Sequence, residues 1–501
     1  MTAYGRDRVR RGLQHFLLGK VVSAGAGFVA MVLVVRGLAV SEFAAYAVLL
    51  ALVEVFTAIS GMGLSHVIMR YVPELYSAQR MAPLRQVVGV AISLRTAVLV
   101  LALLGALLAA RPLASLLALD DMVPAVKLFL LVVGLRSTAH FLSQILESTL
   151  HQGYSQFGFA TSAVGRCLGM LWLLQAGQVS LIQVITLEAA CDLLACIILL
   201  VGLVDVLRVP PAGPASHTNA DRWAATQRGQ MTRFAVAAYL QHLATLPFGG
   251  NTNRLVGGVL FGDRLMASFG FSLSLYEYAK RYLPSQLLVG LIRPIVVARF
   301  TESRNFSAVA KLCEQSFQIN LLVLLAVLLL VVVAGPELLG QLSAGKYGAD
   351  SASLLIALLL VLLLETQRLL LEVLTQTVER YDLMIASNLF LSSSVLLAIL
   401  AYPWLGAMAF PVANGLALLL ANGSTIRRLA GIGFDYPLDR TSTWQAVVVF
   451  ALSAAVGLGL KWLGLHWMVN LAAAVLVYAV LFVKLQMRAS VVYLKALLGR
   501  P

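Results

Sequence analysis

The chain has 501 residues, of which 60% are hydrophobic and only 12% are charged, and its formal net charge is +14. Soluble domains carry roughly 25% charged residues, so this composition excludes a soluble enzyme and leaves no room for an aqueous catalytic domain. In a membrane protein the positive charges report topology, and we expect no nucleic-acid partner.

Apolar runs of about 20 residues, each long enough to cross the bilayer as a helix, recur along nearly the whole chain. The first run follows a basic segment and is too long for the core of a cleavable signal peptide, so we interpret it as a retained span. The runs predict an all-α polytopic membrane protein with about fourteen transmembrane helices. We place these helices at 12–36, 43–66, 86–110, 124–148, 156–176, 180–204, 232–255, 265–290, 314–334, 353–378, 384–402, 405–426, 444–462 and 466–487.

Lysine and arginine are concentrated in the loops and tails on one side of the predicted bundle. By the positive-inside rule, that side is cytoplasmic and holds both termini. The segment 208–230 is rich in Pro, Gly, Ser and charge, which is typical of a linker.

The segments on either side of this linker resemble each other weakly, with Glu54 opposite Glu277 and Pro112 opposite Pro336. We therefore predict two six-helix lobes related by a pseudo-two-fold axis along the membrane normal, with two extra C-terminal helices. The predicted parts are an N-terminal lobe at 1–207, a cytoplasmic linker at 208–230, a C-terminal lobe at 231–430, and helices 13 and 14 with a cytoplasmic tail at 431–501.

Charged residues interrupt several spans of the first lobe, although a charge at the centre of a span costs about 3 kcal/mol. Lys20, Arg95 and Arg136 lie in the first, third and fourth predicted helices and are accompanied only by Glu54 of the second. Because Arg95 and Arg136 are predicted at nearly the same depth, they require an anion or a wet cavity. The alternative to such a cavity is that these charged side chains are scattered and structural, and extend toward the membrane interface. Arg166, in contrast, is predicted at the same membrane depth as two carboxylates of the next helix. We therefore expect it to form an ion pair with Glu188 and Asp192.

The second lobe contains two further groups of charges. Glu277 is within reach of Lys280 and Arg281 at i+3 and i+4, which leaves one positive charge over. A second helix carries acidic and basic residues on one face, where we expect them to neutralise each other. These residues are Glu365, Arg368 and Glu372.

Two prolines predict broken helices near the lobe boundary. Pro284 removes a backbone donor inside its helix, and Pro247 lies in the stretch LPFGGNTNR. Broken backbone at membrane depth survives only against protein or a cavity. The four cysteines lack metal-ligand spacing, so we expect neither a metal site nor a cofactor. A two-lobed bundle with a basic interior predicts a transporter of a large anionic substrate by alternating access.

The N-terminal 160 residues resemble the polysaccharide and O-antigen flippase family of the multidrug, oligosaccharidyl-lipid and polysaccharide exporter superfamily. The resemblance is carried by Arg36, Gly37, Leu38, Glu42, Phe43, Tyr46, Gly63 and Leu64, followed by Arg70, Tyr71 and Pro73.

This resemblance implies a non-enzymatic flippase in the bacterial inner membrane. Such a protein moves a polyprenyl-diphosphate-linked oligosaccharide across the membrane for surface polysaccharide (O-antigen or exopolysaccharide) assembly. The implied partners are this anionic lipid-linked oligosaccharide, membrane lipid, and a polysaccharide polymerase with other assembly proteins. Arginines and lysines in the cavity would hold the diphosphate. The expected substrate contacts are Lys20, Arg95, Arg136, Lys280 and Arg281. Glu54 and Glu277 are candidates for ion coupling, and Pro247 and Pro284 for helix bending.

Three alternatives remain open. A drug or cation antiporter of the same fold predicts an acidic cavity, and a flippase for the peptidoglycan lipid precursor predicts a cationic one. A membrane-embedded polymerase or ligase predicts catalytic residues in a long outer loop. The connection 335–352 offers only Glu337, Lys346 and Asp350 for that role.

Overall fold

The computed structural model describes residues 6–208, 217–286, 305–378 and 380–485, together with Val296 and Phe300. Throughout these ranges every regular element is a helix, and eleven stretches are long and apolar enough to cross a membrane. The chain is therefore a polytopic, all-helical membrane protein, as the sequence predicts. It forms two compact units, Met1–Leu246 with Arg254–Ala267, and Pro247–Asn253 with Ser268–Pro501.

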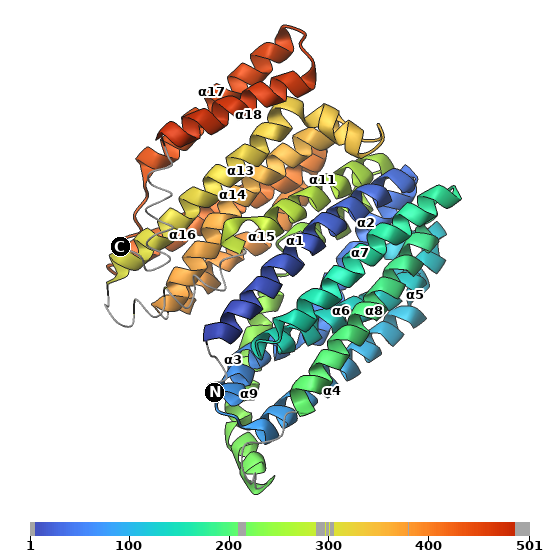
Figure 1. Cartoon of the computed structure of the whole chain (residues 1–501), viewed down its shortest axis with the longest axis vertical. Coiled ribbons are helices and arrows are strands. Elements are labelled where there is room, and N and C mark those ends of the chain that lie inside the picture. The colour runs from blue at the N-terminus through green and yellow to red at the C-terminus, as the bar shows by residue number, and fades with distance from the viewer. Residues whose placement is uncertain are drawn as a thin grey trace. The chain divides into compact units, whose positions relative to one another are not determined.

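The first unit is a bundle in which α6 packs against α8 and α2, and α7 packs against α1 (Figure 1). Its elements are α1 (Arg6–Gly37), α2 (Val40–Gly61), α3 (Leu64–Ser77), α4 (Met81–Leu108), α5 (Ala110–Leu116), the 3-10 turn η1 (Asp120–Met122), α6 (Val123–Ser148), α7 (Gln152–Ala176), α8 (Leu181–Arg208) and α9 (His217–Thr245). Apolar side chains from α3, α4, α6 and α8 form one buried core, including Ile68, Leu84, Ile145 and Leu199.

A break between α2 and α3 corrects the predicted helix at 43–66. Met62 has a φ of 45° and Gly63 a φ of 71°, and these left-handed residues end α2 and start α3. The apolar run continues through this point, so hydrophobicity alone could not reveal the turn. The amphipathic α3 buries one face and exposes Arg70 and Glu74 on the other.

The predicted linker lies partly outside the described residues, at 209–216, and is helical in α9 from His217 onward. The α9 helix packs against α3 and α4. It ends at Thr245, before Pro247, and α10 (Gly250–Leu260) and α11 (Asp263–Tyr282) follow. The predicted helix at 232–255 is thus two helices.

A second break follows α11, where Leu283 lies outside the helix immediately before Pro284. The backbone N–H of Ser285 donates to Asn320 Oδ1 at 2.8 Å. This side chain therefore satisfies a backbone donor that the broken helix leaves without an internal partner.

The second unit is built around the long helix α13, which packs against α14, α17 and α18, while α16 packs against α14 and α15 (Figure 1). Its later elements are α13 (Phe306–Leu342), α14 (Ala349–Thr377), α15 (Tyr381–Leu405), the 3-10 turn η2 (Gly406–Met408), α16 (Ala409–Gly431), α17 (Arg440–Trp462) and α18 (Trp467–Leu485). The α13 helix bends at Ala334, with a φ of −131°, and continues past Pro336. The predicted end at residue 334 is therefore the position of a kink.

Polar contacts attach the C-terminal hairpin α17–α18 to α13 near both ends of α17. The buried Glu314 accepts hydrogen bonds from the Tyr436 hydroxyl at 2.8 Å and the Asp439 backbone N–H at 3.2 Å. Near the other end, Lys461 Nζ lies 2.7 Å from Glu337 Oε1. Asp439 also caps α17, and hydrogen bonds from Ser442 keep the pKa of Asp439 below its usual value. The predicted tail beyond residue 485 lies outside the described residues.

Candidate functional site

A network of charged side chains lies inside the first unit, centred on Arg136 of α6. Arg136 Nη2 lies 2.8 Å from Asp192 Oδ2 and 3.2 Å from Glu188 Oε2, both on α8. The two acidic residues are only 4% exposed. Burying such charges is tolerable only when each finds a partner, so α6 and α8 meet through a strong ionic contact.

Three more side chains complete this network. The Tyr46 hydroxyl of α2 donates to Glu188, and Ser162 Oγ of α7 donates to Asp192 Oδ1 at 3.3 Å. Arg166 of α7 lies 3.8 Å from the same carboxylate. Two guanidinium groups therefore face two carboxylates, and the charges of the network cancel.

This network corrects one expectation and refines another. The expected absence of a carboxylate beside Arg136 is wrong, because α6 packs against α8 and brings Glu188 and Asp192 to it. Arg166 does pair with Asp192, but Glu188 is taken by Arg136.

Arg95 of α4 has a different environment. It is 3% exposed, and its Nη2 donates to the Ser137 carbonyl at 3.2 Å and to the Ser137 hydroxyl at 2.9 Å. Its guanidinium carbon lies 4.4 Å from the centroid of the Phe141 ring. Its Nε is buried and has no hydrogen-bond acceptor among the described residues, and no described carboxylate pairs with it. Because Ser137 follows Arg136 in α6, the two arginines lie at the same level, as the sequence predicts.

The other predicted site residues of the first unit lie on α1 and α2. Lys20 is half-buried and close enough to Glu147 for electrostatic attraction. Glu54 is half-buried, and it makes no ion pair with any side chain in the described part of the chain. Among the predicted site residues of the first unit that the structure describes, Arg95 is therefore a buried cation and Glu54 a half-buried anion, and neither has an opposite charge bound to it.

In the second unit, Lys280 of α11 forms an ion pair with Glu365 of α14, with Nζ 2.6 Å from Oε2. Tyr276 also forms a hydrogen bond with Glu365. Lys280 is thus paired with a carboxylate of another helix, and Glu277 of its own helix is also near enough to attract it. Arg281 is exposed, with its guanidinium carbon 5.9 Å from the Tyr278 ring centroid.

Glu277 faces the start of α10. A β-carbon on Gly250 would lie 3.2 Å from Glu277 Oε1. A carboxylate at this position is attracted by the partial positive charge of a helix N-terminus. The break after Pro247 thus places the first residue of α10 beside this acidic side chain.

Glu372 is near enough to attract Arg368 within α14, but the hydrogen bonds of Arg368 go to other helices. Its guanidinium donates to Thr425 at 3.1 Å, and to Ser387 and Asn388 at 2.7 Å each. These neutral groups belong to α15 and α16, so Arg368 bonds neighbouring helices instead of its own acidic residues.

The partners that sequence reasoning missed all come from other helices. Arg136 forms ion pairs with Glu188 and Asp192, and Lys280 forms an ion pair with Glu365. Comparing depths between α6 and α8 could have suggested the first pairing, but sequence alone does not show that these helices touch. Among the described residues, no group of three His, Cys, Asp or Glu side chains could hold a metal ion.

No family model and no curated protein sequence matches this chain. Solved structures do match. One is the lipid II flippase MurJ in an inward closed conformation, at a TM-score of 0.58 and 11% identity, over 93% of this chain and 97% of that chain. Another is an inward-facing multidrug resistance MATE family transporter of the MOP superfamily. It matches at a TM-score of 0.65 and 12% identity, over 83% of this chain and 99% of that chain.

A P26A mutant of a MATE protein also matches, at a TM-score of 0.52 and 12% identity, over 86% of this chain and 98% of that chain. At these identities the similarity shows the fold. The chain is therefore a multi-pass membrane protein with the fold of the MOP-superfamily transporters.

Proposed function

We propose that this protein is a flippase that moves a polyprenyl-diphosphate-linked oligosaccharide across a bacterial inner membrane, by alternating access, for surface polysaccharide assembly. The observation that carries the proposal is Arg95, a buried guanidinium with a free donor and no carboxylate partner among the described residues. A phosphate oxygen would supply both the missing acceptor and the missing negative charge. The fold shared with a lipid II flippase supports the same reading.

The other predicted cations differ in how readily they could contact the substrate. Arg136 and Lys280 are engaged by carboxylates, so they would contact substrate only after those ion pairs open. Lys20 and Arg281 remain candidates for contact with the glycan or the diphosphate. Lipid-linked oligosaccharide and membrane lipid are the proposed partners, followed by a polymerase and other assembly proteins.

The decisive experiment measures translocation in proteoliposomes that contain a fluorescent polyprenyl-diphosphate-linked oligosaccharide. Wild-type protein should translocate it, and Arg95→Ala should abolish translocation while remaining folded. Arg80→Gln is the matched control, because Arg80 is an exposed arginine next to α4. Translocation by Arg95→Ala at the wild-type rate would remove Arg95 from the site.

A drug or cation antiporter is the second candidate, and it is favoured by the MATE similarity and by the unpaired carboxylate of Glu54. Cells that express the protein would then resist cationic drugs, and Glu54→Gln would abolish this resistance. Unchanged drug susceptibility together with oligosaccharide translocation would exclude this candidate.

We further propose that Glu54 or Glu277 couples flipping to an ion gradient. Glu54 is free to bind a proton or cation, and Glu277 lies at the start of α10. Translocation should then accelerate when a pH gradient is imposed across the proteoliposome, and either Glu54→Gln or Glu277→Gln should remove the acceleration. A rate that ignores both pH and sodium gradients would contradict the coupling.

A further inference from the structure

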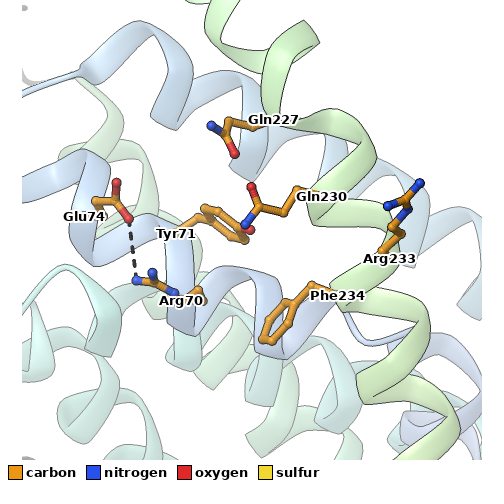
Figure 2. A pocket seen from close by; sticks show the side chains of 7 residues that line it. All are labelled: Arg70, Tyr71, Glu74, Gln227, Gln230, Arg233 and Phe234. Atoms are coloured by element: carbon orange, nitrogen blue, oxygen red, sulfur yellow. Dashed lines mark ion pairs between the residues drawn. The ribbon is translucent and has the colours of Figure 1, made fainter.

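A pocket with a volume of about 580 Å³ lies within the first unit, between α3 and α9 (Figure 2). Its apolar side is formed by Tyr71 and Phe234, whose rings are 6.4 Å apart and nearly perpendicular. The helices approach closely at one point because Gly63 has no side chain. A β-carbon at Gly63 would collide with the Ala235 carbonyl oxygen.

The polar side of the pocket is cationic. Arg70 and Arg233 line it together with Glu74 (Figure 2). Arg70 Nη1 lies 3.5 Å from Glu74 Oε2, and both side chains are more than half exposed. Arg233 is exposed and makes no ion pair with the described residues. The pocket therefore has an excess positive charge that is open to a ligand.

The remaining lining residues, Gln227 and Gln230, supply amide groups that both donate and accept hydrogen bonds. Further along α9, the apolar side chains Val236 and Leu240 are 51% and 60% exposed. One helix thus passes from polar pocket residues to exposed apolar residues within about three turns. Such a boundary is the arrangement expected where a helix leaves the headgroup region and enters hydrocarbon.

We propose that this pocket binds the phosphate-bearing headgroup of a membrane lipid. The phosphate would be bound by Arg70 or by Arg233, which lie on opposite sides of the pocket (Figure 2), because guanidinium groups bind phosphate oxygens through paired, charge-assisted hydrogen bonds. Gln227 and Gln230 would contact hydroxyl groups of the headgroup, and the lipid tails would follow Val236 and Leu240.

Two lipids offer this chemistry, an anionic phospholipid of the bilayer and a polyprenyl diphosphate. The second source deepens the proposed function and rests on it, because the pocket would then be where the transported lipid is captured. The first source is independent of the proposed function.

The experiment measures binding to the full-length, detergent-purified protein by native mass spectrometry. The probes are farnesyl diphosphate, phosphatidylglycerol and, as a neutral reference, phosphatidylcholine. The variant is the double substitution Arg70→Gln and Arg233→Gln. The matched control is Arg228→Gln, since Arg228 is an exposed arginine of the same helix that does not line the pocket.

We expect the double variant to bind one of the two anionic probes about tenfold more weakly than wild type, which corresponds to the loss of one charge-assisted contact. The control should bind it as wild type does. Loss confined to farnesyl diphosphate assigns the pocket to the transported lipid, and loss of phosphatidylglycerol assigns it to the bilayer.

Unchanged binding of both anionic probes in the double variant would overturn the proposal, and so would equal losses in the Arg228→Gln control. Preference of the wild-type protein for phosphatidylcholine would also overturn it. The assay requires no transport, so its failure is distinguishable from failure of the Arg95 experiment.

Discussion

Two arginines at one level of the first unit show how strongly a residue's role depends on its immediate neighbours. Arg136 lies between two carboxylates of α8, whereas Arg95 bonds only to the neutral Ser137 and to the ring of Phe141. The sequence predicted their shared depth, but it could not predict which one would meet Glu188 and Asp192. Removing each side chain should accordingly have a different kind of effect, on stability for Arg136 and on translocation for Arg95.

We expect Arg136→Met to destabilise the protein by about 3–5 kcal/mol, because it leaves buried carboxylates without their main counter-charge. The measurement is thermal unfolding of the purified protein in detergent.

The matched control for Arg136→Met is Arg70→Gln, which breaks the exposed contact between Arg70 and Glu74. Exposed ion pairs contribute at most about 1 kcal/mol, so the control should unfold near the wild-type temperature. Equal unfolding temperatures for Arg136→Met and wild type would show that the network does not stabilise the bundle.

At the scale of the element, close packing between helices depends on single small residues. A β-carbon on Gly457 of α17 would lie 2.8 Å from both methyl carbons of Val333 in α13, and 3.0 Å from the β-carbon of Ala474 in α18. A β-carbon on Gly459, two residues later, would meet no other atom within 4 Å. These neighbouring glycines therefore separate the effect of packing from the effect of helix propensity.

We expect Gly457→Ala to destabilise the protein, because forcing extra volume into a packed contact costs roughly 1–3 kcal/mol. Gly459→Ala should stabilise it slightly, since alanine favours a helix over glycine by about 1 kcal/mol. Unfolding midpoints of the two variants provide the test. Shifts of the same sign and size would contradict the close contact of α17 with α13.

The elements themselves were the most predictable part of the structure. Apolar length located the eleven spans in the described part of the chain, and the composition around Pro247 and Pro284 marked positions where helices end. Met62 was missed because an apolar residue gives no sign that it will adopt a left-handed conformation. The partners of Lys280 and Arg136 were missed for another reason, since helix neighbours follow from packing and cannot be read from spacing along one helix.

For the whole molecule, the distribution of basic residues predicts the side of the membrane on which each turn lies. With both termini in the cytoplasm, the turns at Gln79 and Gly433 lie inside, and those at Gly177 and Gly464 lie outside. Each of these residues lies between helices and is exposed, so a reactive group placed beside it should be accessible.

A variant lacking its four cysteines should accept a single cysteine at Ala78, Phe434, Gln178 or Leu465, beside these turns. A membrane-impermeant maleimide added to intact cells should label the cysteines at 178 and 465 only. After the cells are permeabilised, all four should react. Labelling at 78 or 434 in intact cells would invert or abolish the predicted orientation.

The attachment of α17 and α18 also affects how far the polypeptide can be shortened. A version that stopped at residue 431 would keep Glu314 and Glu337 but would discard Tyr436, Asp439 and Lys461, which contact them. Among the described residues, the only hydrogen bond left to Glu314 would then be the one from Gln318, on the newly exposed side of α13. Removing the hairpin would consequently require Glu314 and Glu337 to be replaced by apolar residues in the same step.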